Sequence, residues 1–398
     1  MTLTMLAPAA PATGALLPVY RRAPVEFVRG RGVELFDADG NAYLDFVSGI
    51  AVNALGYDDA GVADAMRDAL TSGLLHVSNL YHTAPARKLA DALVDRSFAS
   101  SVFFCNSGAE ANEGAFKFAR RWAGTVGGSA KREIVGLRGS FHGRLFASLA
   151  ATDRPTYRAP FRPLAGGVTI AERDIEELSA MLDAGTVAAL ILEPVQGEGG
   201  VRVLDGGFLR EVRALTSERQ IALIFDEVQC GLGRTGQLFA HQGMGVEPDL
   251  MTLAKPLAAG LPMGAVLLNQ EIADSVKAGD HATTFGGGPF VASVALHLLE
   301  RLSDPALLSE VRSNGAWLGQ QLTGLIERTG RVRAVRGVGY IWGVDVHIPA
   351  GDVVARALER GLLLCTAGDY TVRLLPPLIA THDDLSRGLA ILEEILSA

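Results

Sequence analysis

Two polar residues, Asp226 and Lys255, each follow a run of apolar residues. Ile221–Asp226 is typical of a buried strand that ends in a carboxylate, and Asp249–Lys255 is a second apolar run that ends in an amine. Neighbouring parallel strands bring such groups to one crevice at their carboxyl ends, where open α/β sheets bind ligands. A buried acid and a buried lysine are costly unless each has a task. Pyridoxal phosphate (PLP) would give both a task, because its aldehyde condenses with a lysine amine and its ring nitrogen needs a carboxylate to stay protonated.

The segment Asn106–Glu113 is expected to join a strand to a helix. Ser107 and Glu110 have the spacing of a capping box. Free N–H groups and the dipole at a helix N-terminus bind anions, and Gly108 would let a phosphate approach the backbone closely. The segment therefore indicates either a helix cap alone or a phosphate site.

The segment Gly139–Arg144 also follows an expected strand. Phe141 could pack in the core or lie against a flat cofactor ring. Arg144 is in a glycine-flanked loop and is a poor core residue, so it is either a solvated charge or a bidentate clamp for a carboxylate. We assign no function to His142.

Three other segments carry candidate binding groups. Glu198 projects from the glycine-rich run Glu193–Gly200, where an acid is usually solvent-exposed. Arg373 has apolar neighbours on both sides and therefore needs an anionic partner, which is either structural or a substrate carboxylate. The loop His281–Gly288 places two hydroxyls before three glycines and could donate hydrogen bonds to a phosphate.

The composition excludes several classes of protein. The chain has 398 residues, with 48% hydrophobic and 20% charged residues, which indicates a globular protein with two domains or with one large domain and a smaller lobe. A net charge of −8 argues against nucleic acid and anionic membranes as partners. Three widely spaced cysteines form no metal-ligand pattern and no disulfide framework, so we expect no metal and a reducing compartment, the cytoplasm. No apolar run is long enough for a membrane span.

The order of the expected elements indicates an α/β protein. Residues 1–18 are expected to be a flexible arm, and Val25–Phe46 a hairpin that turns at Asp37–Asn41. Helices are expected near residues 60–72, 84–97 and 290–327. Strands are expected at Val102–Cys105, Ile134–Leu137, Ala188–Leu192, Ile221–Phe225, Leu250–Leu253 and Ala265–Leu268, and in the tail at Val332–Val335, Tyr340–Val346 and Thr371–Leu374. Strands that alternate with helices favour a mainly parallel sheet covered on both faces.

These motifs, taken in order, resemble those of the class III (subgroup II) PLP-dependent aminotransferases. The resemblance covers nearly the whole chain from about Tyr20 and is carried by the segments Ser107–Glu113, Phe141–Arg144, Glu193–Gly200, Asp226–Gln229, Gly233–Gly236, Lys255 and Thr284–Gly287. It implies fold type I, with a mainly parallel seven-stranded sheet in a large domain and a smaller α+β domain built from both chain termini. We expect the small domain over residues 19–60 and 291–398 and the large, PLP-binding domain over residues 61–290.

The resemblance implies a role in cofactor binding for each matching residue. Lys255 would hold PLP covalently and later move a proton, and Asp226 would pair with the pyridine nitrogen. The ring would lie between Val228 and Phe141. The remaining cofactor-binding residues would be Glu227 and Gln229 beside the ring, Ser107, Gly108 and Ala109 at the phosphate, and Thr284, which would reach that phosphate from the partner subunit of a homodimer.

The resemblance also implies a substrate. Gly49–Gly56, Val77–Tyr81 and Asp226–Gly231 resemble the branch that transfers the terminal amino group of N2-acetyl-L-ornithine to 2-oxoglutarate in arginine biosynthesis. Arg144 would bind the carboxylate of acetylornithine, with Thr283 at the substrate's edge. Arg373 would bind the α-carboxylate of glutamate or 2-oxoglutarate, and Glu198 would pair with Arg373 when the other substrate is present.

Other functions stay open. Carrier-bound lysine, succinyl-ornithine, ornithine and 4-aminobutyrate are alternative donors, and a PLP-binding regulator without turnover is a remote alternative. Two positions depart from the usual family pattern: Pro289 follows Gly287-Gly288 directly, and Pro256 follows Lys255. Because proline favours extended geometry in the preceding residue, we expect Lys255 to lie at a strand end in extended conformation.

Overall fold

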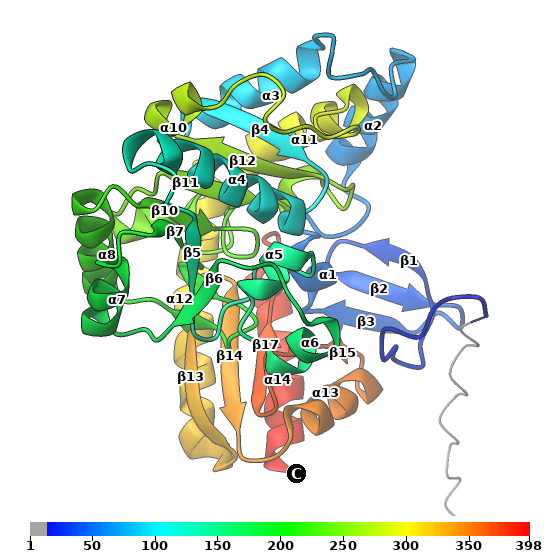
Figure 1. The fold of residues 1–398 in the computed structure, drawn as a ribbon. Helices are drawn as coiled ribbons and strands as arrows, with labels where there is room; N and C mark the ends of the chain where they lie inside the picture. The colour runs from blue at the N-terminus through cyan, green and yellow to red at the C-terminus, as the bar shows by residue number, and fades with distance from the viewer. Residues whose placement is uncertain (1–13) are drawn as a thin grey trace, which may run out of the picture.

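The computed structural model describes residues 14–398, so most of the arm expected over residues 1–18 lies outside the described residues. A seven-stranded sheet forms the centre of the larger part (Figure 1). Its strands, in spatial order, are β4 (Ser101–Cys105), β12 (Gly264–Leu268), β11 (Leu250–Leu253), β10 (Ala222–Asp226), β7 (Val187–Leu192), β5 (Glu133–Leu137) and β6 (Val168–Ala171). Only β12 runs antiparallel to its two neighbours, so the mainly parallel seven-stranded sheet is confirmed.

The strands are apolar because helices cover both faces of this sheet. Successive side chains of a strand point to opposite faces, so Ile191 and Ile224 pack in the cluster that contains α4 (Gly108–Val126). Leu190 and Leu223 pack in the cluster on the other face, formed by two further helices. These are α7 (Ile175–Leu182) and α8 (Gly206–Glu218).

Short elements complete this part of the molecule. The helices are α5 (Phe146–Ala150), α6 (Pro155–Arg158), α9 (Ala240–Met244), α10 (Gln270–Ser275) and the 3-10 helices η1 (Ala159–Phe161) and η2 (Lys255–Ala258). A two-stranded ribbon pairs β8 (Val195–Gln196) with β9 (Arg202–Val203).

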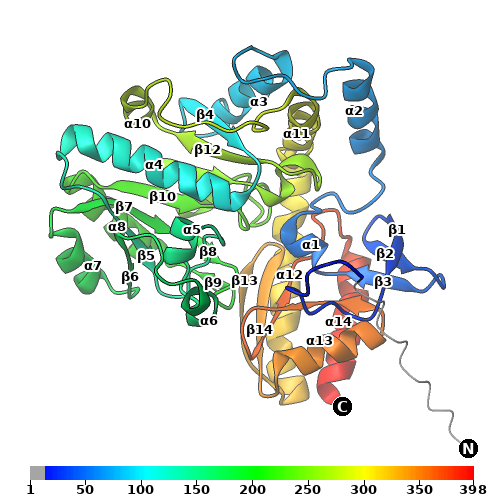
Figure 2. The same ribbon diagram turned by 45° about the vertical axis from the view of Figure 1, so that its right-hand side comes forward.

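Two smaller sheets are built from the two ends of the chain. The first has the order β1 (Phe27–Arg31), β2 (Glu34–Asp37), β3 (Ala42–Asp45) and β15 (Leu362–Leu363), and the second has the order β13 (Val332–Val338), β14 (Ile341–Val346), β17 (Thr371–Leu374) and β16 (Cys365–Thr366). The expected hairpin is therefore present as β2–β3, with β1 added at its edge. β15 pairs in parallel with β3, which places the C-terminal part beside the N-terminal strands (Figure 2).

The remaining helices include one that the sequence analysis described wrongly. They are α1 (Ser48–Ala51), α2 (Ala60–Thr71), α3 (Ala84–Val94), α11 (Pro289–Leu302), α12 (Pro305–Thr329), α13 (Ala350–Glu359) and α14 (His382–Ser397). The single helix expected over residues 290–327 is two helices, because Asp304 accepts a hydrogen bond from the Ala306 N–H at 2.8 Å and Pro305 begins a new helix. None of the helices within residues 14–398 is both long and apolar enough to cross a membrane.

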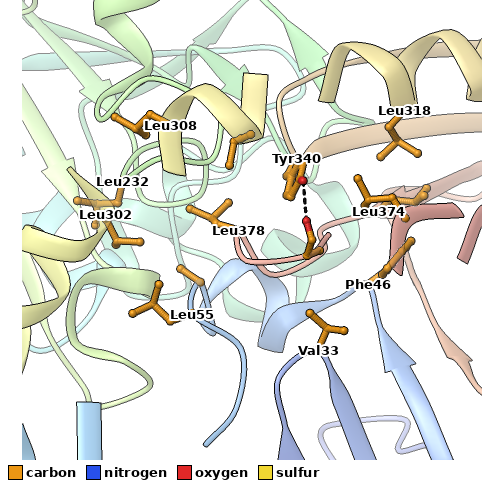
Figure 3. Close-up of a cluster of buried hydrophobic side chains, with 14 of the residues drawn as sticks. Val33, Phe46, Leu55, Leu232, Leu302, Leu308, Leu318, Tyr340, Leu374 and Leu378 are labelled. Atoms are coloured by element: carbon orange, nitrogen blue, oxygen red, sulfur yellow. Dashed lines mark hydrogen bonds between the residues drawn. The ribbon is translucent and has the colours of Figure 1, made fainter. Parts of the chain in front are cut away.

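The largest apolar core joins the two ends of the chain (Figure 3). Val33, in the turn between β1 and β2, and Phe46, just after β3, belong to the same cluster as Leu374 from β17. The hydroxyl of the buried Tyr340 donates a hydrogen bond to the Ala380 carbonyl at 2.8 Å inside this core. The same cluster includes Met251 of β11 and Leu267 of β12, so it also joins the two ends of the chain to the large sheet.

Candidate active site

A cavity of about 400 Å³ opens at the carboxyl ends of β10 and β11. The two strands are adjacent and parallel, with Asp226 opposite Thr252, so the chain segments that follow them meet at one edge. The cavity is lined by nine of the residues expected from the sequence, namely Ser107, Gly108, Ala109, Phe141, Arg144, Asp226, Val228, Gln229 and Lys255.

Lys255 lies two residues beyond the end of β11, but its conformation differs from the expectation. Its φ is +30°, and it begins the 3-10 helix η2 instead of continuing the strand. The extended geometry expected from Pro256 is therefore wrong. A positive φ is unfavourable for a residue with a side chain, so packing around the cavity must hold this conformation. Removal from bulk water lowers the pKa of the Lys255 amine.

Asp226 is held at the base of the cavity by hydrogen bonds to both carboxylate oxygens. Oδ1 accepts the Val228 N–H at 3.0 Å, and Oδ2 accepts Nδ2 of Asn112 at 2.8 Å. Nδ1 of His142 lies 2.8 Å from the same Oδ2. Because the carboxylate can only accept, Nδ1 carries the hydrogen of this contact.

His142 and Asn112 are therefore site residues to which the sequence analysis gave no role. His142 is buried and lines the cavity, and its Nε2 has no hydrogen-bond partner among the described residues. Asn112 also donates to the His142 carbonyl and accepts the Thr252 hydroxyl, both at 2.8 Å. No local pattern marks these roles, because the two residues reach Asp226 only through the fold.

The N-terminus of α4 forms another wall of the cavity. Ser107 Oγ accepts the Glu110 N–H at 3.2 Å, while the Glu110 carboxylate accepts the Asn106 N–H at 2.8 Å. The expected capping box thus closes one residue early, on Asn106. A Cβ on Gly108 would lie 2.7 Å from Val228 Cγ1, so only glycine fits here. The first intrahelical bond is donated by Ala111, so the N–H groups of Gly108 and Ala109 precede the helical hydrogen bonds and are available to an anion.

Phe141 and Arg144 line the cavity beside this helix start, because Gly143 between them packs against Ala109 of α4. Phe141 lines the cavity and its N–H donates to Glu193 Oε1 at 2.8 Å. The exposed Arg144 guanidinium lies 3.5 Å from the centre of the Tyr157 ring, a cation–π contact. No carboxylate within residues 14–398 forms an ion pair with Arg144, so its charge is available to a ligand.

Arg373 lies on β17, behind Gln229. The residue is 1% exposed, and its guanidinium donates to Glu198 Oε1 at 2.6 Å and to Gln229 Oε1 at 3.0 Å. Burial acts to raise the pKa of Glu198, but the Arg373 charge outweighs it and holds the pKa below its usual value. Neither Arg373 nor Glu198 lines the cavity, and Gln229 separates Arg373 from it.

Glu193 is a second buried acid that the sequence analysis did not single out. Its two oxygens accept the N–H groups of Phe141 at 2.8 Å and Gly197 at 3.1 Å, so it joins the loop of Phe141 to the loop of Glu198. Burial raises the pKa of Glu193 to about 7. Its motif position, at the end of β7, could have indicated a role, but the two loops that it joins are visible only in the fold.

Besides Arg373 and Glu198, three further expected site residues do not line the cavity. The Glu227 carboxylate accepts the N–H groups of Ala240 at 2.6 Å and His241 at 2.8 Å, so it caps α9 on the far side of the loop. Thr283 accepts a hydrogen bond from Nδ2 of Asn106 at 3.2 Å, at the cavity's edge. Thr284 is exposed on the surface.

The comparisons with known proteins agree on one family. Residues 18–396 match the family described as "Aminotransferase class-III". The chain belongs to the class III aminotransferases. It is 44% identical to the acetylornithine aminotransferase of Methanocaldococcus jannaschii, over 96% of each chain.

Solved structures of other aminotransferases have the same fold. The N-acetylornithine aminotransferase of Stenotrophomonas maltophilia K279a superposes with a TM-score of 0.83 at 36% identity, over 95% of this chain and 97% of the other. The ornithine aminotransferase of Toxoplasma gondii ME49 superposes with a TM-score of 0.91 at 28% identity, over 96% and 92%.

The cavity of this aminotransferase fits PLP, the cofactor of its family. An amine at Lys255, a carboxylate at Asp226 and the free N–H groups at the start of α4 match the aldehyde, the ring nitrogen and the phosphate in chemical type. Val228 and Phe141 supply apolar surface for a ring. The residues described by the structure contain no group of three or more acidic, histidine or cysteine side chains that could hold a metal ion.

Proposed function

We propose that this PLP-dependent aminotransferase moves the terminal amino group of N2-acetyl-L-ornithine to 2-oxoglutarate, giving N-acetyl-L-glutamate 5-semialdehyde and glutamate. The observation that carries the proposal is the presence of two arginines in different states: Arg144 is exposed and unpaired, and Arg373 is buried and paired with Glu198. Acetylornithine reacts at its terminal amino group, whereas glutamate reacts at its α-amino group. The distance from the reacting carbon to the α-carboxylate therefore differs between them, and two carboxylate-binding groups at different positions are needed. The acetylornithine aminotransferases among the relatives support the same substrate.

The cofactor roles follow from where the residues lie. Lys255 would hold PLP covalently, and Asp226 would face the ring nitrogen, with its orientation fixed by Asn112 and His142. Ser107, Gly108 and Ala109 would bind the phosphate at the start of α4. Val228 and Phe141 would enclose the ring, and Gln229 would lie beside it. Glu227 would act indirectly, because its carboxylate binds the N-terminus of α9 and does not line the cavity.

When bound, PLP supplies an electron sink that stabilises negative charge on the carbon bearing the donor's amino group. Asp226 would stabilise a positive charge on the nitrogen of the PLP ring, which would strengthen that sink. Once the donor's amine has displaced Lys255 from the cofactor, the freed Lys255 Nζ would remove the proton from the donor carbon. Its lowered pKa leaves more of the amine neutral near pH 7, as a general base requires.

The two arginines would separate the substrates. Arg144, held over Tyr157, would bind the carboxylate of acetylornithine, with Thr283 at the substrate's edge. The Glu198 carboxylate would neutralise Arg373 while acetylornithine is bound. When 2-oxoglutarate or glutamate enters, Glu198 would move away and Arg373 would bind the α-carboxylate. The glycines on both sides of Glu198 allow such a movement.

We include a homodimer in the proposal, with Thr284 reaching the phosphate of the partner subunit. Thr284 is exposed and does not line the cavity of its own chain. Beside it, Phe285 is 66% exposed, and Leu80 and Tyr81 of the neighbouring loop are also exposed. Asn79 joins the two loops by donating to the Gly286 carbonyl at 3.1 Å. A second copy would cover this apolar surface. The three free cysteines agree with a reducing location such as the cytoplasm.

The test is a panel of donors with 2-oxoglutarate as acceptor. Acetylornithine should give the highest kcat/KM, ahead of succinyl-ornithine, ornithine, 4-aminobutyrate and carrier-bound lysine. Ornithine deserves particular care in the panel, because ornithine aminotransferases are among the structural neighbours. A preference for free ornithine or for carrier-bound lysine would overturn the substrate assignment. Failure of all donors while PLP binds would favour a regulator without turnover.

A further inference from the structure

A second cavity, of about 650 Å³, lies outside the candidate active site. It is formed where α8, α9, α12 and the turn between β13 and β14 meet. None of the residues that line it also lines the cavity around Lys255. Its volume is within the range of small-molecule sites, about 300–1,000 Å³.

The walls of this second cavity are mainly apolar. Trp342, Met244 and Val338 line it, and apolar side chains exceed polar ones over its surface. Trp342 is fixed in place, because its Nε1 donates to the Gly339 carbonyl at 2.7 Å and its ring lies against Gly319, where a Cβ would approach to 2.2 Å. Such a fixed aromatic wall would bind an apolar group without first having to become ordered.

Two arginines at this cavity have no acidic partner. Arg210 on α8 forms no hydrogen bond or ion pair with residues 14–398, and Arg312 on α12 donates only to the Gly236 carbonyl. Acidic residues outnumber basic ones, 44 to 36, and many other arginines are paired with carboxylates. Arg144 has the same property, an unpaired guanidinium beside a partly apolar cavity.

The wall also contains an unsatisfied polar group. The hydroxyl of Thr235, which is 8% exposed, has no hydrogen-bond partner among the described residues. Thr235 is in the Gly233–Gly236 motif, to which the sequence analysis gave no task of its own. The main chain here is tightly fixed: the Tyr340 N–H donates to the Arg234 carbonyl at 2.9 Å, and a Cβ on Gly339 would lie 2.7 Å from the Thr235 carbonyl carbon.

We propose that this cavity is a second binding site, for a small amphipathic carboxylate. Arg210 and Arg312 bind the carboxylate, and Trp342, Met244 and Val338 contact the apolar body. Guanidinium groups bind carboxylates with directed, charge-assisted hydrogen bonds, whereas a neutral analogue would leave both charges unpaired. The site therefore selects acids over isosteric amides.

The test uses 3-phenylpropanoate as the probe and 3-phenylpropanamide as its neutral control. All proteins are PLP-loaded and carry Arg144→Ala, so that a carboxylate bound at Arg144 does not contribute. Calorimetry should show that the acid binds at least about tenfold more tightly than the amide, because it gains charge-assisted hydrogen bonds. The acid should also change the tryptophan fluorescence, and Trp342→Phe should remove most of that change.

A matched set of variants locates the probe. Arg210→Gln together with Arg312→Gln should weaken binding of the acid at least about tenfold and abolish the preference over the amide. Arg356→Gln, an exposed arginine on α13 outside the cavity, should leave binding unchanged. Ala316→Phe, on the cavity wall, should weaken acid and amide alike by filling the space.

Melting curves check that each variant is folded, as expected for substitutions at the exposed Arg210, Arg312, Ala316 and Arg356 and for the replacement of the partly buried Trp342 by another aromatic residue. The proposal is overturned if the acid does not bind at millimolar concentration, or if it binds no more tightly than the amide. It is equally overturned if the double arginine variant binds the acid as the parent does.

Discussion

Nδ1 of His142 lies 2.8 Å from Oδ2 of Asp226, and both side chains are buried beneath the cavity. A carboxylate that faces a protonated ring nitrogen must keep its charge and its direction. His142 favours the charged form of Asp226 and fixes the direction of its carboxylate, because it donates to Oδ2, which also accepts a hydrogen bond from Asn112. In the proposed function, the strength of the cofactor's electron sink would therefore depend on the contact of His142 with Asp226.

Replacing His142 should slow the proton step without preventing PLP binding. His142→Ala removes a hydrogen bond to a charged group, worth about 1.5–3 kcal/mol, so kcat should fall by about 10- to 100-fold. Asp226→Asn should retain PLP and lose several orders of magnitude. Rapid-mixing kinetics of the first half-reaction measures both effects. Parent-like rates in Asp226→Asn would show that this carboxylate does not support the sink.

Lys255→Ala should abolish turnover and the covalent retention of PLP after borohydride reduction, as detected by mass spectrometry. The control is Lys131→Met. Lys131 is also buried, but its amine donates to the carbonyls of Arg219 and Gln220 at the end of α8. This variant should lose stability and keep covalent PLP, whereas turnover by Lys255→Ala would contradict the mechanism.

Arg144→Ala should raise the KM for acetylornithine at least about tenfold, and by more than the KM for 2-oxoglutarate, because a charge-assisted contact is lost. Tyr157→Leu removes the ring beneath the guanidinium and should shift the same constants in the same direction, by a smaller factor. Steady-state kinetics with each substrate varied is sufficient. Equal changes for both substrates would overturn the division of work between Arg144 and Arg373.

Glu198→Gln should impair the two half-reactions unequally. Without the acid, Arg373 keeps an unpaired charge that attracts the carboxylate of acetylornithine to the wrong position. Single-turnover kcat/KM for acetylornithine should therefore fall by about tenfold, while glutamate reacts as fast as in the parent or faster. A loss of the glutamate reaction instead would mean that Glu198 does not control Arg373.

Glu193 predicts a pH effect on stability. Its pKa is raised by burial to about 7, well above that of an exposed glutamate in the unfolded chain, so the folded state favours the proton. The stabilising contribution is complete below about pH 4.5 and is lost as the pH rises through about 7. The melting temperature of the parent minus that of Glu193→Gln should therefore decrease between pH 5 and pH 8. A difference that stays constant or increases with pH would contradict a raised pKa.

The sequence predicted the large sheet well because its strands are nearly continuous apolar runs that helices cover on both faces. β6 was missed because Val168–Ala171 is short and follows an irregular stretch. The break between α11 and α12 was missed although Asp304 and Pro305 are a recognisable helix start. The φ of Lys255 could not be predicted, because tertiary packing overrides the preference that Pro256 imposes.

The location of a candidate site residue was predictable where the local sequence shows both the motif and the end of the strand that positions it. Ser107, Gly108 and Asp226 each lie at a junction between a strand and the segment that follows, so their place was visible in the local pattern. The contacts of Asp226 with His142 and Asn112 join residues far apart in the chain. No local pattern contains such information, and the same is true of Glu193.

The pairing of β15 with β3 has a consequence for how this protein is made. The two strands come from opposite ends of the polypeptide. The sheet that contains β3 therefore cannot be completed until the ribosome has synthesised almost the entire chain. During synthesis the apolar residues around Phe46 stay exposed until the C-terminal residues that cover them have been translated. Chains that terminate prematurely would therefore expose this surface, and we expect them to require chaperones or to be degraded.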